Sequence, residues 1–328
     1  MPRRWSGVKH GGSGGRLRWA PRPMLCSRLE RGPGPPKRTQ SGAPTLNALR
    51  SRLHTAHGLQ FVGAPSALMA RLIEHHGFDG VYLSGAGVAN SVYGVPDDGT
   101  IGLEQLTAVA RSVCSATALP VICDADTGFS ESDDVSACVR SLEEAGVAAI
   151  QIEDQVAAKK CGHLDGKQLI PAELMAGKIR SAAAARRDPG LVLIARTDAR
   201  GVTGWDDAVA RARAYRAAGA DMIFIEALPD AGEFGRFAQA SPGPLLANMT
   251  EFGKSALLDR ARLAEAGYTV IIYPVTLLRL MLASADAALA EIKRSGHQRN
   301  LVSGMWTRKR LYELLDYDEP VPEPPPPA

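Results

Sequence analysis

Eight short apolar runs, separated by segments with helical spacing, are the feature that most limits how this chain can fold. None of the runs alternates polar and apolar residues, which is typical of parallel strands buried on both faces. The runs are Leu59–Gly63, Gly80–Ser84, Pro120–Asp124, Ala148–Glu153, Leu191–Thr197, Asp221–Glu226, Pro244–Asn248 and Val270–Tyr273. We therefore expect eight parallel strands.

The segments between these runs place apolar residues at helical spacing. They include Ser66–His76, Leu103–Ala116, Ser132–Ala145, Ala172–Arg187 and Trp205–Ala218. Glycines such as Gly146 and Gly219 stand where a helix should end before the next strand. Strand and helix repeated eight times predict a (β/α)8 barrel. The alternative, a doubly wound open sheet, lacks the expected GxGxxG after its first strand.

The predicted catalytic domain, residues 45–318, lies between two tails that we expect to be disordered. Residues 1–44 are rich in Gly, Pro and Arg, and residues 319–328 are rich in Pro. Residues 1–40 hold ten Lys and Arg against one acid, which leaves 28 Lys and Arg against 34 Asp and Glu elsewhere. The predicted barrel is therefore acidic, which argues against a nucleic-acid partner.

Neither a membrane nor an oxidising compartment is indicated. The chain has no run of about 18 apolar residues, so no membrane span is expected. Its five cysteines form no CxxC pair, and Cys114, Cys123 and Cys138 lie in apolar patterns typical of buried thiols. We expect a cytoplasmic protein.

Two more helices are expected beyond the last strand, at Leu277–Arg294 and Ser303–Leu315. A (β/α)8 barrel needs only one helix there. The last helix is therefore available for a partner subunit.

Polar side chains end nearly every predicted strand. In a (β/α)8 barrel these ends form the active site. The residues are Tyr82, Ser84, Gly85, Ala86, Asp124, Asp126, Glu153, Asp154, Arg196, Asp198, Glu226, Asn248, Thr250 and Tyr273. A few of them, including Asp198, could serve only as helix N-caps. One shared polar pocket explains the whole set better.

Three of these residues indicate a metal site. Asp124 and Asp126 are two positions apart and would point the same way if their strand continued. Glu153 ends the neighbouring strand. Three unpaired carboxylates would repel one another, and oxygen ligands favour magnesium or manganese over zinc.

Further binding groups accompany these acids. Ser84-Gly85-Ala86-Gly87 is a small-residue loop suited to presenting backbone N–H groups to a carboxylate or phosphate. Arg196 ends the fifth strand, where its guanidinium can bind a carboxylate with two hydrogen bonds.

A cysteine follows the same strand as Glu153, in the sequence Lys159-Lys160-Cys161-Gly162-His163. The lysines and the histidine can lower the pKa of the thiol and make Cys161 a proton donor or a nucleophile. The alternative is a solvated basic loop with an incidental cysteine. We favour the functional interpretation because the loop leaves a strand that ends in a metal candidate.

KKCGH, with IEDQ just before it and DADTG upstream, resembles the signature of the isocitrate lyase and phosphoenolpyruvate mutase superfamily. ARTDA, GADMIFIEA and LANMTEFGKS resemble further family segments in the same order. The cysteine loop and the length are similar to the methylisocitrate lyase group. That group includes dimethylmalate lyases, oxaloacetate hydrolases and carboxyphosphonoenolpyruvate phosphonomutases.

The resemblance implies a (β/α)8 barrel, commonly a homotetramer that exchanges C-terminal helices. It implies that Asp124, Asp126 and Glu153 hold magnesium and that Asp97 supports these three ligands. It implies a carboxylate substrate bound by Ser84, Gly85, Ala86, Gly162, Arg196, Glu226, Asn248 and Thr250.

The implied reaction is carbon–carbon cleavage of a 2-hydroxy di- or tricarboxylate such as 2-methylisocitrate, giving an alpha-keto acid and a succinate-type carboxylate. Cys161 would be the general acid, Tyr82 the candidate base, and Lys159 and His163 further catalytic residues. The alternatives are carboxyvinyl-carboxyphosphonate phosphorylmutase chemistry, isocitrate or dimethylmalate cleavage, oxaloacetate hydrolysis, or a non-enzymatic binding barrel. The residues after His163, Leu164-Asp165-Gly166-Lys167, are closer to isocitrate and dimethylmalate lyases than to bacterial methylisocitrate lyases.

Overall fold

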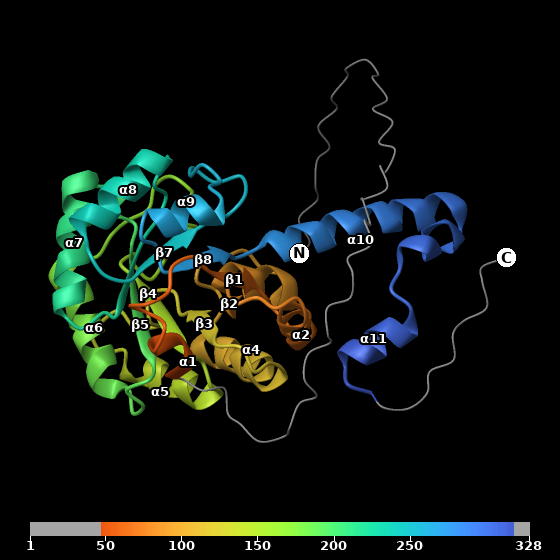
Figure 1. Ribbon diagram of the computed structural model, residues 1–328, viewed down its shortest axis with the longest axis horizontal. Helices are drawn as coiled ribbons and strands as arrows, with labels where there is room; N and C mark the ends of the chain where they lie inside the picture. Colours follow the sequence, from red (N-terminus) through yellow and green to blue (C-terminus); the bar gives the residue numbers. More distant parts are fainter. Residues whose placement is uncertain (1–46, 318–328) are drawn as a thin grey trace, which may run out of the picture. The chain divides into compact units, whose positions relative to one another are not determined.

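The computed structural model describes residues 47–317, in which eight parallel strands form a closed barrel in sequence order (Figure 1). The strands are β1 Leu59–Gly63, β2 Gly80–Leu83, β3 Val121–Asp124, β4 Ala149–Glu153, β5 Val192–Thr197, β6 Met222–Ile225, β7 Leu245–Asn248 and β8 Val270–Tyr273. All eight predicted strands are confirmed to within one residue at each end. The open-sheet alternative is excluded because β1 pairs with β8, with Phe61 opposite Ile272.

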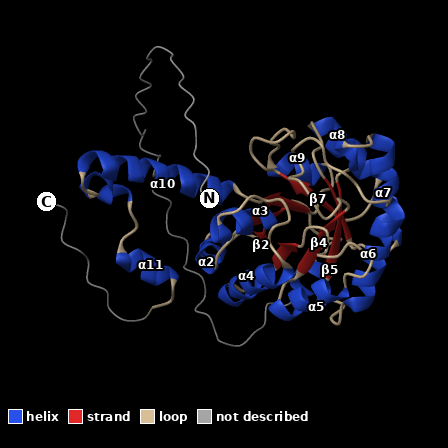
Figure 2. Cartoon of the chain, turned by 180° about the vertical axis from the view of Figure 1, so that it is seen from behind, coloured by secondary structure: helices blue, strands red, loops and turns tan. Residues whose placement is uncertain are grey.

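Most of the helices surround the barrel (Figure 2). The helices of the described residues are α1 Asn47–Arg50, α2 Ala67–His75, α3 Gly85–Val88, α4 Leu103–Ala116, α5 Ser136–Ala145, α6 Ala172–Ala185, α7 Trp205–Ala217, α8 Ala231–Ala240, α9 Arg260–Glu265, α10 Thr276–Ser295 and α11 Arg308–Leu314, with the π-helix η1 Ala89–Tyr93 and the 3-10 helices η2 Ala199–Gly201 and η3 Arg299–Gly304. Gly146 has a φ of 93° after α5 and Gly219 a φ of 113° after α7. These left-handed positions end the helices, as the sequence predicts.

Two apolar layers stabilise the barrel. Side chains such as Phe61, Ile194 and Phe224 fill its interior and are fully buried, so the barrel is a packed core rather than a pore. A second layer lies between the strands and the helices and contains Cys114, Cys123 and Cys138. These three thiols are buried, as expected.

The C-terminal helices differ from the rest. α10 runs away from the barrel in Figure 1, and of its residues only Leu278 is buried. Leu282 and Leu289 are exposed by 59% and 67%. The last helix begins at Arg308, later than expected, because Thr307 caps it. No helix within residues 47–317 is both long and apolar enough to cross a membrane.

The two tails expected to be disordered, residues 1–44 and 319–328, lie outside the described residues. The expected domain bounds therefore stay a prediction.

Candidate active site

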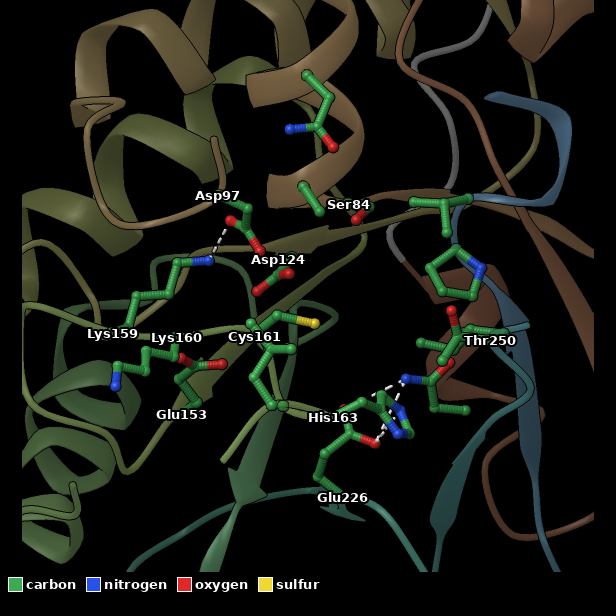
Figure 3. Close-up of a pocket in the computed structure, with 18 of the residues that line it drawn as sticks. Ser84, Asp97, Asp124, Glu153, Lys159, Lys160, Cys161, His163, Glu226 and Thr250 are labelled. Carbon is green, nitrogen blue, oxygen red and sulfur yellow. Dashed lines mark hydrogen bonds and ion pairs between the residues drawn. The ribbon is translucent and has the colours of Figure 1, made fainter. Parts of the chain in front are cut away.

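A cavity of about 830 Å³ opens at the carboxyl ends of the strands (Figure 3). Fourteen of the sixteen site residues expected from the sequence line it. They are Tyr82, Ser84, Ala86, Asp97, Asp124, Glu153, Lys159, Cys161, Gly162, His163, Arg196, Glu226, Asn248 and Thr250. The other two, Gly85 and Asp126, line a small adjoining cavity.

Asp124 and Asp126 meet through a backbone turn. β3 ends at Asp124, as predicted, and Asp126 has a φ of 48°, so the strand does not continue through both residues. Their carboxylates nevertheless converge on Gly85. A Cβ added there would lie 3.0 Å from Asp126 Oδ1 and 3.5 Å from Asp124 Oδ2. Gly85 also donates its N–H to Asp124 Oδ2 at 3.3 Å.

Burial dominates the electrostatics of this acidic side. Loss of hydration raises the pKa of Asp126 to about 7 and also raises the pKa values of Asp124 and Glu153. Glu153 Oε1 is buried without a hydrogen-bond partner. Oxygen-only donors and an orphaned carboxylate oxygen fit a hard divalent cation.

Lys159 lies among these acids. Its Nζ contacts Asp97 and is 2.6 Å from Asp126 Oδ1, and its side chain is 4% exposed. Burial lowers the pKa of this lysine, but the surrounding carboxylates outweigh burial, and the net shift is upward. Within residues 47–317, no group of three or more His, Cys, Asp or Glu side chains is arranged to hold a metal. The lysine ammonium therefore supplies the positive charge in this arrangement.

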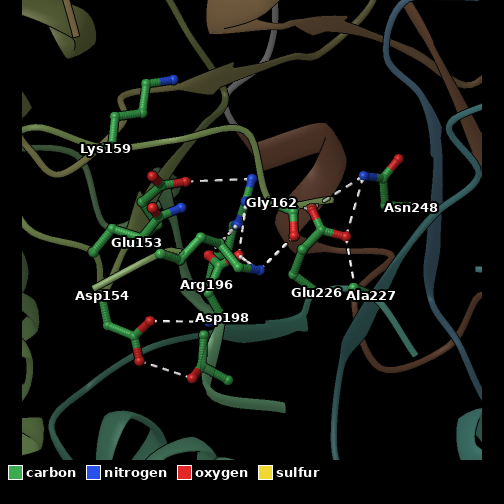
Figure 4. A network of polar contacts seen from close by, with 12 residues as sticks. Glu153, Asp154, Lys159, Gly162, Arg196, Asp198, Glu226, Ala227 and Asn248 are labelled. Carbon is green, nitrogen blue, oxygen red and sulfur yellow. Dashed lines mark hydrogen bonds and ion pairs between the residues drawn. The ribbon is translucent and has the colours of Figure 1, made fainter. Parts of the chain in front are cut away.

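The opposite side of the cavity is an ion-pair network around Arg196 (Figure 4). Arg196 donates to Asp198 Oδ2 at 3.0 Å and Oδ1 at 3.2 Å. It also lies 3.3 Å from both Glu153 Oε2 and Glu226 Oε2. Asn248 Nδ2 donates to Glu226 Oε2 at 3.2 Å. Burial raises the pKa of Glu226, but Arg196 and His163 outweigh it and lower the pKa to about 2.

The loop Lys159–Lys167 contacts this network. Gly162 packs so closely that an added Cβ would lie 2.2 Å from Arg196 Nη2 and 2.6 Å from Glu226 Cγ. His163 Nε2 is 3.1 Å from Glu226 Oε1, and its Nδ1 accepts the Lys254 N–H at 2.9 Å. A glycine is therefore required at position 162 for the loop to dock.

The side chain of Cys161 is exposed and lines the cavity. Of the three basic neighbours in the loop, Lys159 and His163 contact other groups. Lys159 pairs with Asp97 and Asp126, and His163 contacts Glu226. The loop thus presents the thiol to the cavity while its basic residues hold the loop in place.

Tyr82 is a buried hydrogen-bond donor. Its hydroxyl donates to Gln151 Oε1 at 2.9 Å, and Gln151 Nε2 donates to Asp124 Oδ1 at 3.0 Å. Burial, with a further contribution from Asp124, raises the pKa of Tyr82 well above its ordinary value. A neutral phenol is a poor base, so these surroundings oppose the base role expected from the sequence.

Sequence reasoning missed two residues of the site and gave a third another role. Gln151 is a polar residue inside the apolar β4 run, and a polar residue at such a position could have indicated a role in the site. Lys167 lay in the noted sequence HLDGK without a role. Asp198 makes no helix-cap hydrogen bond and instead lies fully buried between Arg196 and Lys167.

Comparison with known proteins identifies the family of this chain. Residues 49–293 match the model of the phosphoenolpyruvate phosphomutase family. The chain is 48% identical over 273 residues to probable 2-methylisocitrate lyase 1 of Corynebacterium glutamicum, covering 83% of this chain and 89% of the relative. It is 47% identical over 257 residues to 2-methylisocitrate lyase of Aeropyrum pernix, covering 78% and 82%.

Solved structures show the same fold. A 2,3-dimethylmalate lyase structure superposes with a TM-score of 0.76 at 34% identity, covering 85% of this chain and 93% of that one. The phosphoenolpyruvate phosphomutase of Streptomyces platensis gives a TM-score of 0.78 at 30% identity, covering 83% and 96%.

Several curated lyases are 41–49% identical to the chain, which makes it a carbon–carbon lyase enzyme. The family model covers about three quarters of the sequence. This chain therefore belongs to the phosphoenolpyruvate phosphomutase family, within the isocitrate lyase and phosphoenolpyruvate mutase superfamily.

Proposed function

We propose that the chain is a magnesium-dependent lyase that cleaves a 2-hydroxy di- or tricarboxylate, with 2-methylisocitrate as the first substrate to test. The observation that carries this proposal is the position of Cys161, on a loop docked over a cavity with buried acids on one side and Arg196 on the other. The curated 2-methylisocitrate lyases at 47–48% identity support the substrate class.

We assign the metal to the acidic side. Asp124, Asp126 and Glu153 would hold magnesium, with Asp97 beside them, because their oxygens fit a hard cation. When bound, the metal would chelate the 2-hydroxy acid and acidify its hydroxyl group. A solved phosphonopyruvate hydrolase that is 30% identical contains oxalate and Mg²⁺, which supports this assignment. Manganese is the alternative ion.

The chain's own residues would bind and orient the substrate. Ser84, Gly85 and Ala86 lie next to Asp124 and would take the hydroxy-acid end. Tyr82 would act there as a hydrogen-bond donor rather than as a base. Arg196, Glu226, Asn248 and Thr250 would bind the substrate on the opposite side, where Gly162 and His163 would reach its distal carboxylate.

Cys161 would then act as the general acid. A carboxylate of the acidic side would take the hydroxyl proton as the carbon–carbon bond breaks. The hydroxyl oxygen would become the carbonyl oxygen of the alpha-keto acid, and the bonding pair would stay on the other fragment as a carboxylate enolate. The Cys161 S–H would protonate the enolate carbon and become a thiolate. The docked loop would exclude water while the enolate exists.

A turnover screen with Mg²⁺ tests the proposal. The panel contains 2-methylisocitrate, isocitrate, dimethylmalate, oxaloacetate and a carboxyphosphonate, with products identified by mass spectrometry. We expect an alpha-keto acid from one of the 2-hydroxy acids. Release of a phosphonate product alone would contradict carbon–carbon cleavage, and equal turnover after chelation would contradict the metal.

We also propose that the enzyme is a cytoplasmic homotetramer that exchanges C-terminal helices. A groove of about 440 Å³, lined by Val62, Leu72, Phe78, Tyr273 and Leu277 among others, lies beside the root of α10. The exposed apolar side chains of α10 would cover such a groove on a partner subunit. Light scattering coupled to size exclusion measures the mass, and a monomer at micromolar concentration would contradict the assembly.

A further inference from the structure

We propose that Lys167 is a positioning residue, which holds the Lys159–Lys167 loop in its docked form and couples the loop to Arg196. Lys167 is the last residue of the loop in sequence. Leu169, two residues later, forms a β-bridge with Gln155. The kinetic part of this inference rests on the proposed lyase function. The structural part does not.

Lys167 joins the loop to the end of β5 through a single buried ammonium. Its Nζ donates to the carbonyl oxygen of Gly162 and lies 2.8 Å from Asp198 Oδ1. The Lys167 and Asp198 side chains are exposed by only 2% and 0%. A buried charge is strongly destabilising without its partners, so the ammonium favours the loop conformation that brings Gly162 to it.

Asp198 pairs with both Lys167 and Arg196 and so connects the two residues. The Asp198 carboxylate accepts two hydrogen bonds from the guanidinium, and its N–H donates to Asp154 Oδ1 at 2.9 Å. Asp154 is itself fixed by the Tyr215 hydroxyl at 2.8 Å. Asp198 is thereby fixed to the barrel, and it holds Lys167 on one side and Arg196 on the other.

Gly162 contacts both Lys167 and Arg196. Its carbonyl accepts from Lys167, and its Cα lies against Arg196 Nη2. The loop residue next to Cys161 and the guanidinium that faces the cavity are therefore positioned by the same lysine. Loss of Lys167 should release the loop and disturb Arg196 together.

The loop has a second charged tether that serves as a matched control. Asp165 Oδ1 lies 2.5 Å from Lys254 Nζ, but the two side chains are exposed by 94% and 40%. Exposed pairs contribute little, typically about 0–1 kcal/mol. Removing the Asp165 charge should therefore leave the loop docked.

The experiment compares Lys167→Met, Lys167→Arg and Asp165→Asn by hydrogen exchange on the full-length protein without metal or substrate. Two peptides are followed: the loop, and the segment that contains Lys254, whose N–H donates to His163 only when the loop is docked. We expect exchange to accelerate by about tenfold or more in both for Lys167→Met, with the barrel strands unchanged. Asp165→Asn should stay within about twofold of wild type.

Turnover gives the second readout. Lys167→Met should lower kcat/KM by about 100-fold through loss of loop and Arg196 positioning, and Lys167→Arg, which keeps the charge, should restore part of it. Wild-type exchange in both peptides of Lys167→Met would overturn the inference. Should Lys167→Met not fold, the same exchange measurement on Lys167→Arg decides: a smaller acceleration in both peptides supports the inference, and wild-type exchange overturns it. If wild type turns over no carboxylate while the exchange result holds, the proposed function fails and the positioning role stands.

Discussion

The two sides of the cavity contain the same kind of group, carboxylates with little exposure, yet the pKa values of Asp126 and Glu226 shift in opposite directions. On the β3–β4 side, burial raises the pKa of Asp126 to about 7, even with Lys159 beside it. On the β5–β7 side, the Glu226 side chain is 2% exposed against 13% for Asp126, but its pKa falls to about 2 because Arg196 and His163 outweigh burial. Burial alone therefore does not decide the direction in which the pKa of a site carboxylate shifts; the charged and hydrogen-bonding partners beside it decide it as well.

The two sides differ in how many of their carboxylates have partners. We call the side around Arg196 and Glu226 the paired side, and the side around Asp124, Asp126 and Glu153 the acidic side. Glu226 already has partners in Arg196, His163 and Asn248. The acidic side has more carboxylates than cations, and Glu153 Oε1 has no hydrogen-bond partner. A divalent ion would balance the excess negative charge of the acidic side. The paired side needs no further ion and is left to bind the substrate.

The largest expected effect is on Cys161, which is presented between the two sides. Cys161→Ser should lower turnover by about 10²–10⁴-fold, because a hydroxyl is a much weaker proton donor than a thiol. Calorimetric titration should show that Mg²⁺ and substrate still bind. Near-normal turnover would remove Cys161 from the reaction.

Removing the central cation of the paired side should be the next largest effect. Arg196→Met leaves Asp198, Glu153 and Glu226 buried without their shared partner, and we expect it to lower the free energy of unfolding by about 3–5 kcal/mol. Denaturant unfolding measures the change. The control is Arg180→Met, which breaks an exposed pair with Glu173 and should cost under about 0.5 kcal/mol. Similar values for both would contradict a stabilising network around Arg196.

The pH dependence of the paired side follows from Glu226. Its folded pKa of about 2 lies below the ordinary value of 4.5, so its contribution is present above about pH 4.5 and lost as pH falls toward 2. We expect a loss on the order of 1–3 kcal/mol over this range. Thermal unfolding should show a flatter acid limb for Glu226→Gln. An unchanged acid limb would mean that this carboxylate is not paired in solution.

The acidic side should show the opposite slope. The folded pKa of Asp126, about 7, lies above its ordinary 3.8, so the metal-free protein binds this proton more tightly than the unfolded chain does. Stability should fall as pH rises from about 4 to about 7, by on the order of 1–2 kcal/mol or a few degrees in Tm. Asp126→Asn should flatten the slope, and Mg²⁺ should restore stability at pH 8. A slope unaffected by both changes would contradict an acidic side with more carboxylates than cations.

Local patterns in the sequence were enough for the barrel and for most of the cavity. Strand positions follow from continuous apolar runs, and a barrel brings strand ends such as those at Asp124, Glu153 and Arg196 to one rim wherever the strands occur. It could therefore be predicted without tertiary structure that these residues line the cavity.

Tertiary structure decided what each of these groups does. Asp126 reaches the site through a left-handed turn that a strand pattern cannot predict. The raised pKa of Tyr82, the place of Lys159 among the acids and the burial of Lys167 with Asp198 all depend on partners far away in sequence. The sequence by itself determined which chemical groups meet at the rim, because apolar periodicity and strand ends are local features. Their charges and contacts were decided only by the folded chain, because burial and pairing arise between distant segments.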